Sequence, residues 1–208
     1  NELIIIHPPE LEHFESFKQI INVYNEKYKI LKINIITGHI NPHIVATIKG
    51  IKESFKTINI ICSAPGKKLI SELWLLKKPG DAESLDLEIP NITLVKKEFT
   101  LKYKDNILHL IPAPTARWPG GLVIYEENSE LLISEKLFSC HIAYEDWSEN
   151  NRLSTENERK HFYNCLMAPM SSQITSLTEK IFEYQIKCIA PLHGPAIEYS
   201  LKSFINDY

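Results

Sequence analysis

Glycine and cysteine are scarce in this chain. Its 208 residues include only seven glycines, which form no GxGxxG or Walker pattern, so no nucleotide or flavin phosphate loop is predicted. The four cysteines form no CxxC pair and lie in apolar contexts. A free thiol in such a context packs as a small hydrophobe, and this usage indicates a reducing, cytoplasmic location.

Long apolar runs and an excess of one charge are also absent. No run reaches the roughly 18 residues of a membrane helix. The net charge of −3 offers no general attraction to nucleic acid or anionic lipid. The length and the 44% hydrophobic fraction fit one globular domain, or a large piece of one. Because the first residues resemble neither a signal peptide nor a natural start, we expect a chain trimmed from a longer protein.

The first part of the chain alternates between two hydrophobic periods. Short apolar runs predict buried strands, and apolar residues at three- and four-residue spacing predict helices. Such alternation is typical of an α/β layered domain. The predicted strands cover residues 3–6, 29–37 and 57–62, and the predicted helices cover residues 8–24, 44–55 and 67–76.

The middle of the chain reads as short strands with short polar connections. With no helices between them we expect antiparallel pairing, with hairpin turns at 105–106 and 127–129. These strands cover residues 92–95, 99–103, 107–111, 122–125 and 131–134. A polar surface loop is predicted from Trp147 to about Glu158. Then follow helices at 159–167 and 171–183, the latter capped by Ser171 or Ser172, a strand at 186–190 and a helix at 197–205. Two α/β segments that flank a run of antiparallel strands favour a four-layer αββα sandwich.

Histidines and cations follow four of the predicted strands. Loops at strand ends gather at one edge of a sheet, which predicts one pocket. Three neutral imidazoles could hold zinc with water as a fourth ligand, and the two cations could then bind an anionic substrate of a zinc hydrolase. The candidate residues are His39, Asn41, His43, Arg117, Lys136 and His193, of which the three histidines are the candidate metal ligands.

A carboxylate is the element that this predicted pocket lacks. A dinuclear iron site needs hard anionic oxygen donors, yet Glu135 is the only acid adjacent to the candidate residues. A divalent ion about 4 Å from one unit charge is repelled by roughly 8 kcal/mol at an effective dielectric constant of about 20. Lys136 can lose its proton, but Arg117 cannot. The residues therefore favour a pocket that is empty or filled by an anion over one that holds a transition metal.

Three segments resemble a known family. Residues 114–122 (PTARWPGGL), 159–169 (RKHFYNCLMAP) and 189–195 (IAPLHGP) are similar to the metallo-β-lactamase-like domain of flavodiiron proteins, in particular the cyanobacterial diflavin flavoproteins. The likeness spans nearly all of residues 1–208, with the family's first strands missing before Leu3. The closing Asp207-Tyr208 also matches, where a flavodoxin domain and then a flavin reductase domain would follow.

The resemblance also implies a changed metal site. The family's HxExDH ligand pattern falls on residues 39–44, where His39 is kept and the Glu, Asp and last His are replaced. The family's ligand His before Trp-Pro falls on Arg117, its bridging Asp falls on Lys136, and its last ligand His is kept as His193. The Arg and Lys replacements resemble one subclass of the cyanobacterial proteins. We therefore expect this domain to hold no iron.

In the family, electrons pass from NADPH through FMN to a diiron site that reduces O₂ to water, in dimers. The resemblance implies this photoprotective scheme for the whole protein, with FMN and NADPH bound by the domains that this chain lacks. Partners are expected to be a second copy or a sibling flavodiiron subunit, not nucleic acid. A mononuclear zinc hydrolase and a structural pseudoenzyme of a hetero-oligomer stay open as alternatives.

Overall fold

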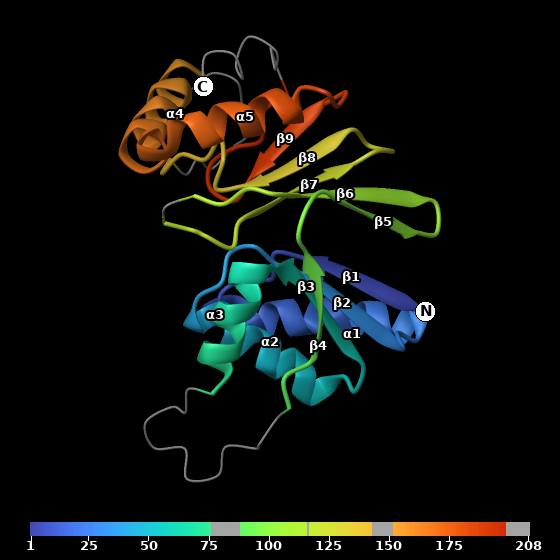
Figure 1. Cartoon of the computed structure of the whole chain (residues 1–208). Coiled ribbons are helices and arrows are strands. Elements are labelled where there is room, and N and C mark those ends of the chain that lie inside the picture. The colour runs from blue at the N-terminus through green and yellow to red at the C-terminus, as the bar shows by residue number, and fades with distance from the viewer. Residues whose placement is uncertain (76–87, 116, 143–151, 199–208) are drawn as a thin grey trace. The chain divides into compact units, whose positions relative to one another are not determined.

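The computed structural model describes residues 1–75, 88–115, 117–142 and 152–198, with only the backbone described at 152–154 (Figure 1). The chain divides into two compact units, Asn1–Val95 and Lys96–Tyr208. Each unit has a sheet of its own and is described by itself.

The first unit is built on a four-stranded parallel sheet with the order β1-β2-β3-β4. Figure 1 shows its helices gathered on one face of the sheet. The strands are β1 (Glu2–Ile6), β2 (Lys32–Ile36), β3 (Ile58–Ser63) and β4 (Asn91–Val95), and the helices are η1 (Leu11–His13), α1 (Phe14–Tyr28), α2 (Pro42–Ser54) and α3 (Ala64–Trp74).

Isoleucine fills the core of the first unit. Ile33 and Ile35 on β2 and Ile60 on β3 have no exposed surface and share one cluster with residues of the helices. Side chains two apart on a strand point to the same face, so this spacing directs the isoleucines toward α1 and α2. Burial of each such side chain contributes roughly 1.5–3 kcal/mol.

Strand β4 corrects one prediction. Residues 92–95 were expected to pair antiparallel with the strands that follow, but β4 lies parallel to β3, with Ile92 opposite Ile60. Parallel neighbours need a long crossover, and α3 supplies part of it before β4 begins. The expected turn at residues 79–81 lies outside the described residues.

The second unit is built on a five-stranded sheet with the order β5-β6-β7-β8-β9. Strands β5 to β8 are antiparallel as predicted, and β9 runs parallel to β8. The hairpin turn at 127–129 is confirmed, whereas the first turn lies at 104–105, one residue before the predicted position, because Asn106 already belongs to β6. The elements are β5 (Phe99–Tyr103), β6 (Asn106–Pro112), β7 (Leu122–Glu126), β8 (Leu131–Glu135), α4 (Arg152–Leu166), η3 (Ala168–Met170), α5 (Ser171–Ile181) and β9 (Cys188–Pro191).

The helices of the second unit correct two further predictions. Helix α4 begins at Arg152, so the predicted loop is wrong from that residue on. Thr155, Arg159 and Phe162 form the buried stripe of α4. Because threonine and arginine are usually exposed, this stripe does not appear as an apolar helical period in the sequence. Helix α5 begins after Met170 without a side-chain cap, so the predicted serine cap is also wrong. The predicted helix at 197–205 lies outside the described residues from 199 on.

The predicted α/β fold class is confirmed, with two sheets and helices in each unit. Within the described part of the chain, every helix is too short or too polar to cross a bilayer.

Candidate functional site

A lysine and a histidine meet where β8 and β9 end. The Nζ atom of Lys136 lies 2.7 Å from Nε2 of His193, although the two residues are 57 positions apart. Because β8 and β9 are parallel neighbours, their exit loops leave the same edge of the sheet. Lys136 is buried, with 7% of its surface exposed, whereas His193 is exposed. The pair is therefore a buried amine with an imidazole on its solvent side.

Backbone contacts hold the two loops together. Leu192 N–H donates to the Glu135 carbonyl at 2.7 Å, and Cys140 N–H donates to the His193 carbonyl at 3.1 Å. Gly194 has a φ of 89°, and a Cβ atom there would lie 2.3 Å from Sγ of Cys140. Only glycine suits this conformation and this close approach.

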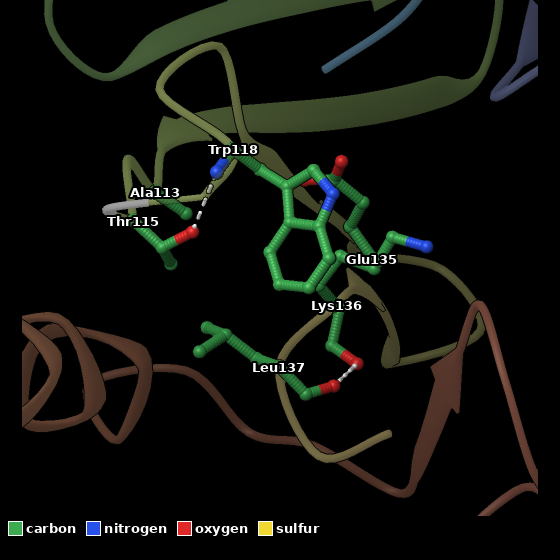
Figure 2. Close-up of a pocket in the computed structure, with 7 residues that line it drawn as sticks. Ala113, Thr115, Trp118, Glu135, Lys136 and Leu137 are labelled. Carbon is green, nitrogen blue, oxygen red and sulfur yellow. Dashed lines mark hydrogen bonds between the residues drawn. The ribbon is translucent and has the colours of Figure 1, made fainter. Parts of the chain in front are cut away.

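Trp118 forms one wall of a small pocket around the lysine. Lys136 Nζ lies 5.2 Å from the centre of the Trp118 ring, and the Arg117 guanidinium lies 5.6 Å from it. The backbone N–H of Trp118 donates to Thr115 Oγ1 at 3.1 Å, which fixes the turn (Figure 2). The pocket is lined by Ala113, Thr115, Trp118, Ser134, Glu135, Lys136 and Leu137.

Glu135 is a carboxylic acid buried beside this pocket. Its Oε2 accepts a hydrogen bond from Leu122 N–H at 3.1 Å, and its Oε1 has no hydrogen-bond partner among the described residues. Burial raises the pKa of Glu135 to about 7, against the opposing effects of the Leu122 hydrogen bond and the Lys136 charge. This acid is therefore partly protonated near neutral pH.

Arg159 ties helix α4 to both loops. Its guanidinium donates to the backbone carbonyls of Phe138 and, at 2.6 Å, of Pro195. Phe138 follows Lys136 by two residues and Pro195 follows His193 by two. Arg159 is 1% exposed, so its position is set by packing. The sequence singled out the segment that contains this residue, but gave no signal for its two contacts.

A second polar group lies in the first unit, at the start of α2. Asn41 caps this helix by accepting from Ile44 N–H at 2.9 Å, and it donates to Glu10 Oε1 at 3.0 Å. The Asn41 amide also contacts His39 Nε2 at 3.2 Å, and Glu10 Oε1 lies 3.9 Å from the same nitrogen. A carboxylate therefore does accompany His39. Sequence analysis missed Glu10 because it precedes η1 by one residue, 29 positions before the histidine.

Two pairs and two separate residues account for the predicted site. The structure brings His39 to Asn41 and Lys136 to His193, places Arg117 on the ring of Trp118, and leaves His43 exposed on α2. Among the described residues, no three His, Cys, Asp or Glu side chains gather in a way that could hold a metal ion. The zinc set and the single pocket stay predictions.

The family follows from comparison with known proteins. A family profile for ODP family beta-lactamases matches residues 1–194. The chain belongs to this family. The relatives include diflavin flavoprotein A 6 of Nostoc sp., which is 29% identical over 100% of this chain and 34% of its own length. Diflavin flavoprotein A 3 of Synechocystis sp. is 28% identical over 84% of this chain and 28% of its own length. The chain thus spans about a third of the length of these relatives.

Solved flavodiiron cores share the fold. The metal-soaked Flv1 flavodiiron core of Synechocystis sp. has a TM-score of 0.81 and 25% identity, covering 99% of this chain and 48% of that one. Fragment 1–254 of diflavin flavoprotein A 5 from Nostoc sp. has a TM-score of 0.79 and 27% identity, covering 99% and 76%. The predicted resemblance is confirmed, and the chain is a flavodiiron-type, metallo-β-lactamase-like domain.

Proposed function

We propose that this chain is the β-lactamase-like domain of a cytoplasmic diflavin flavoprotein that carries electrons from NADPH through flavin to O₂. The names of its relatives support this assignment, and their greater length leaves room for flavodoxin and flavin reductase domains. Within that protein we assign residues 1–208 to one domain whose site is noncanonical and holds no iron.

The contact between Lys136 and His193 carries the noncanonical part of the proposal. In the ligand pattern of the family that this chain resembles, the positions of Lys136 and His193 are iron ligands. Here the imidazole Nε2 of His193 is engaged at 2.7 Å by an amine that is a cation when protonated. An iron ion needs that nitrogen's lone pair and an anionic oxygen, so the donor set of this pair does not fit iron. No step of O₂ reduction is assigned to these residues.

A small anion suits the Lys136 side of the pocket better than a cation does. The buried ammonium and the exposed His193 offer charge-assisted hydrogen bonds, which suit chloride or phosphate. Arg117 is exposed beside the same indole ring and adds a second positive charge. The anion would neutralise a charge that is costly to bury.

In the first unit, one of the residues that replace the family's ligands stabilises the local structure. Asn41 stands where the family pattern has Glu, and its side chain caps α2 while it binds Glu10. Its oxygen is the acceptor from Ile44 N–H and is therefore not directed at a metal. This loop supports the same noncanonical assignment.

The test is the metal content of the purified chain after exposure to Fe(II) and to Zn(II), measured by elemental mass spectrometry. We expect far less than one ion per chain. Lys136→Asp supplies a carboxylate beside His193 and should raise metal uptake, whereas the exposed Lys187→Asp should not. Two irons in the unmodified chain would overturn the proposal. One zinc lost in both His39→Ala and His193→Ala would favour the zinc hydrolase instead.

The third alternative, a structural pseudoenzyme, differs in what the full-length protein does. If that protein reduces O₂ only with a sibling flavodiiron subunit, the domain serves assembly and electron transfer. Oxygen consumption by the full-length protein alone, compared with the mixture, distinguishes the two cases, and its elution volume distinguishes a homodimer from a hetero-oligomer.

A further inference from the structure

Helix α4 carries a thiol and an imidazole in contact on its exposed face. Cys165 and His161 are both exposed, and Sγ of Cys165 lies 3.7 Å from Nε2 of His161 and 4.0 Å from Nδ1. Residues four apart on a helix are neighbours on its surface, so the helix backbone itself holds the two side chains together. Neither residue lines the pocket beside Lys136, so this pair is a separate chemical group.

We propose that this pair is half of a zinc site, completed by the same pair of a second copy of this chain. Thiolate and imidazole are the usual ligands of structural zinc. With Zn–S and Zn–N bonds of about 2.3 and about 2.05 Å at a tetrahedral angle, the two ligand atoms should lie about 3.6 Å apart. The observed separation of 3.7 Å already fits this geometry. Binding breaks the S–H bond, forms an S–Zn bond and releases the proton to water, so no oxidant or reductant is needed.

The number of ligands requires a second copy. Structural zinc is almost always bound by four protein ligands, and His161 and Cys165 supply two. Among the described residues, no third His, Cys, Asp or Glu side chain joins the pair to form a metal-holding group. A second copy related by a two-fold axis presents the same two ligands, which completes a Cys₂His₂ set. The zinc ion, two thiolates and two neutral imidazoles together carry no net charge, so the shared site leaves no charge uncompensated between the copies.

The surface around the pair allows a second α4 helix to approach. Asn157 lies four residues before His161 and Asn164 lies three after it, so both flank the pair on the same side of the helix. Both asparagines are exposed and uncharged. Within residues 155–166, Glu158 is the one charged residue on this face, and its negative charge favours a bound cation.

This site does not depend on the proposed function. The residues that would hold zinc on α4 are not those at the family's iron-ligand positions, so either site can be lost without the other. Metal uptake near Lys136 and His193 is therefore measured in Cys165→Ser, where zinc on α4 does not contribute. Zinc that disappears in this variant supports the present inference, and metal that persists in it bears on the proposed function.

The test titrates the 208-residue chain with Zn(II), and with Co(II) as a coloured substitute. We expect half an ion per chain, a doubling of mass in sedimentation equilibrium that a chelator reverses, and a cobalt–thiolate absorption band. Cys165→Ser and His161→Asn should each remove the band and the doubling. The matched controls are Cys188→Ser and His13→Asn, at a thiol and at an exposed imidazole outside α4, and both should behave as the unmodified chain does.

A thiol titration of the unmodified chain gives a readout that needs no variant. Half an equivalent of zinc should slow the reaction of Cys165 with an aromatic disulfide reagent by about tenfold or more, because the metal occupies the thiolate. The chelator should restore the original rate. No cobalt–thiolate band, or a band that survives in Cys165→Ser, would overturn the inference. One ion per chain with an unchanged mass would overturn the shared site, because the second copy would then supply no ligand.

Discussion

Arg159 on helix α4 donates from Nη2 to the backbone carbonyl of Pro195 at 2.6 Å, and its other terminal nitrogen donates to the carbonyl of Phe138. One buried side chain therefore joins a helix to the two loops that hold Lys136 and His193. The geometry of this pair depends on α4 as much as on the sheet.

Removing this guanidinium should destabilise the second unit. In Arg159→Met the two buried carbonyls lose charge-assisted partners, and we expect a loss of roughly 2–4 kcal/mol in the free energy of unfolding. Urea unfolding measures it. Lys160→Met, at an exposed neighbour on the same helix, is the matched control and should change stability by less than about 0.5 kcal/mol. Equal effects in the two variants would contradict the role of Arg159.

The buried acid Glu135 should make stability depend on pH. Burial raises its pKa from 4.5 to about 7, so the folded chain holds a proton that the unfolded chain has released between these values. Its contribution to stability is fully present below pH 4.5 and is lost as pH rises through 7. Glu135→Gln should therefore be more stable than the unmodified chain at pH 8, by about 3 kcal/mol at most, and not at pH 5.

Urea unfolding of Glu135→Gln at both pH values checks this, with Glu12→Gln, at a carboxylate that is 72% exposed, as the control. If the glutamine variant showed the same difference from the unmodified chain at pH 5 and pH 8, the pKa of Glu135 would not be raised by burial.

Much of the fold could be predicted because it follows from local period. Residues 99–103 were predicted as a strand with the bounds that β5 has, and eight further strands were found within a few residues. Alternation and turn residues decide these elements. The partner of β4 could not be predicted in this way, because it depends on a crossover. The start of α4 was missed because its buried stripe includes Thr155 and Arg159.

The candidate site could be predicted only as a set of residue types. Lys136 and His193 were both identified from the sequence, but their contact depends on the parallel pairing of β8 and β9. The raised pKa of Glu135 depends on burial that the sequence does not reveal. Glu10 was missed because it lies 29 positions before His39 in the sequence, and only the fold brings it to His39 and Asn41.

Asn41 should matter for stability in the first unit. Its side chain caps α2 and also binds Glu10, so Asn41→Ala should cost about 1–2 kcal/mol of unfolding free energy. Asn41→Asp keeps the cap but places a second carboxylate against Glu10. We expect the Asp variant to recover stability only when combined with Glu10→Gln. Additive effects of those two substitutions in urea unfolding would show that Asn41 and Glu10 do not interact.

The thiols should react in an order set by burial. Cys165 is exposed on α4, whereas Cys62 is buried and burial raises its pKa to about 12. Since the thiolate is the reactive form, Cys165 should react first with an aromatic disulfide reagent and Cys62 only after unfolding. Cys165→Ser should remove the fast phase of the thiol titration, and Cys62→Ser should leave it unchanged. A fast phase that persists without Cys165 would mean that another thiol opens readily to solvent, and Cys188, the only other cysteine that is not buried, would be the first to test.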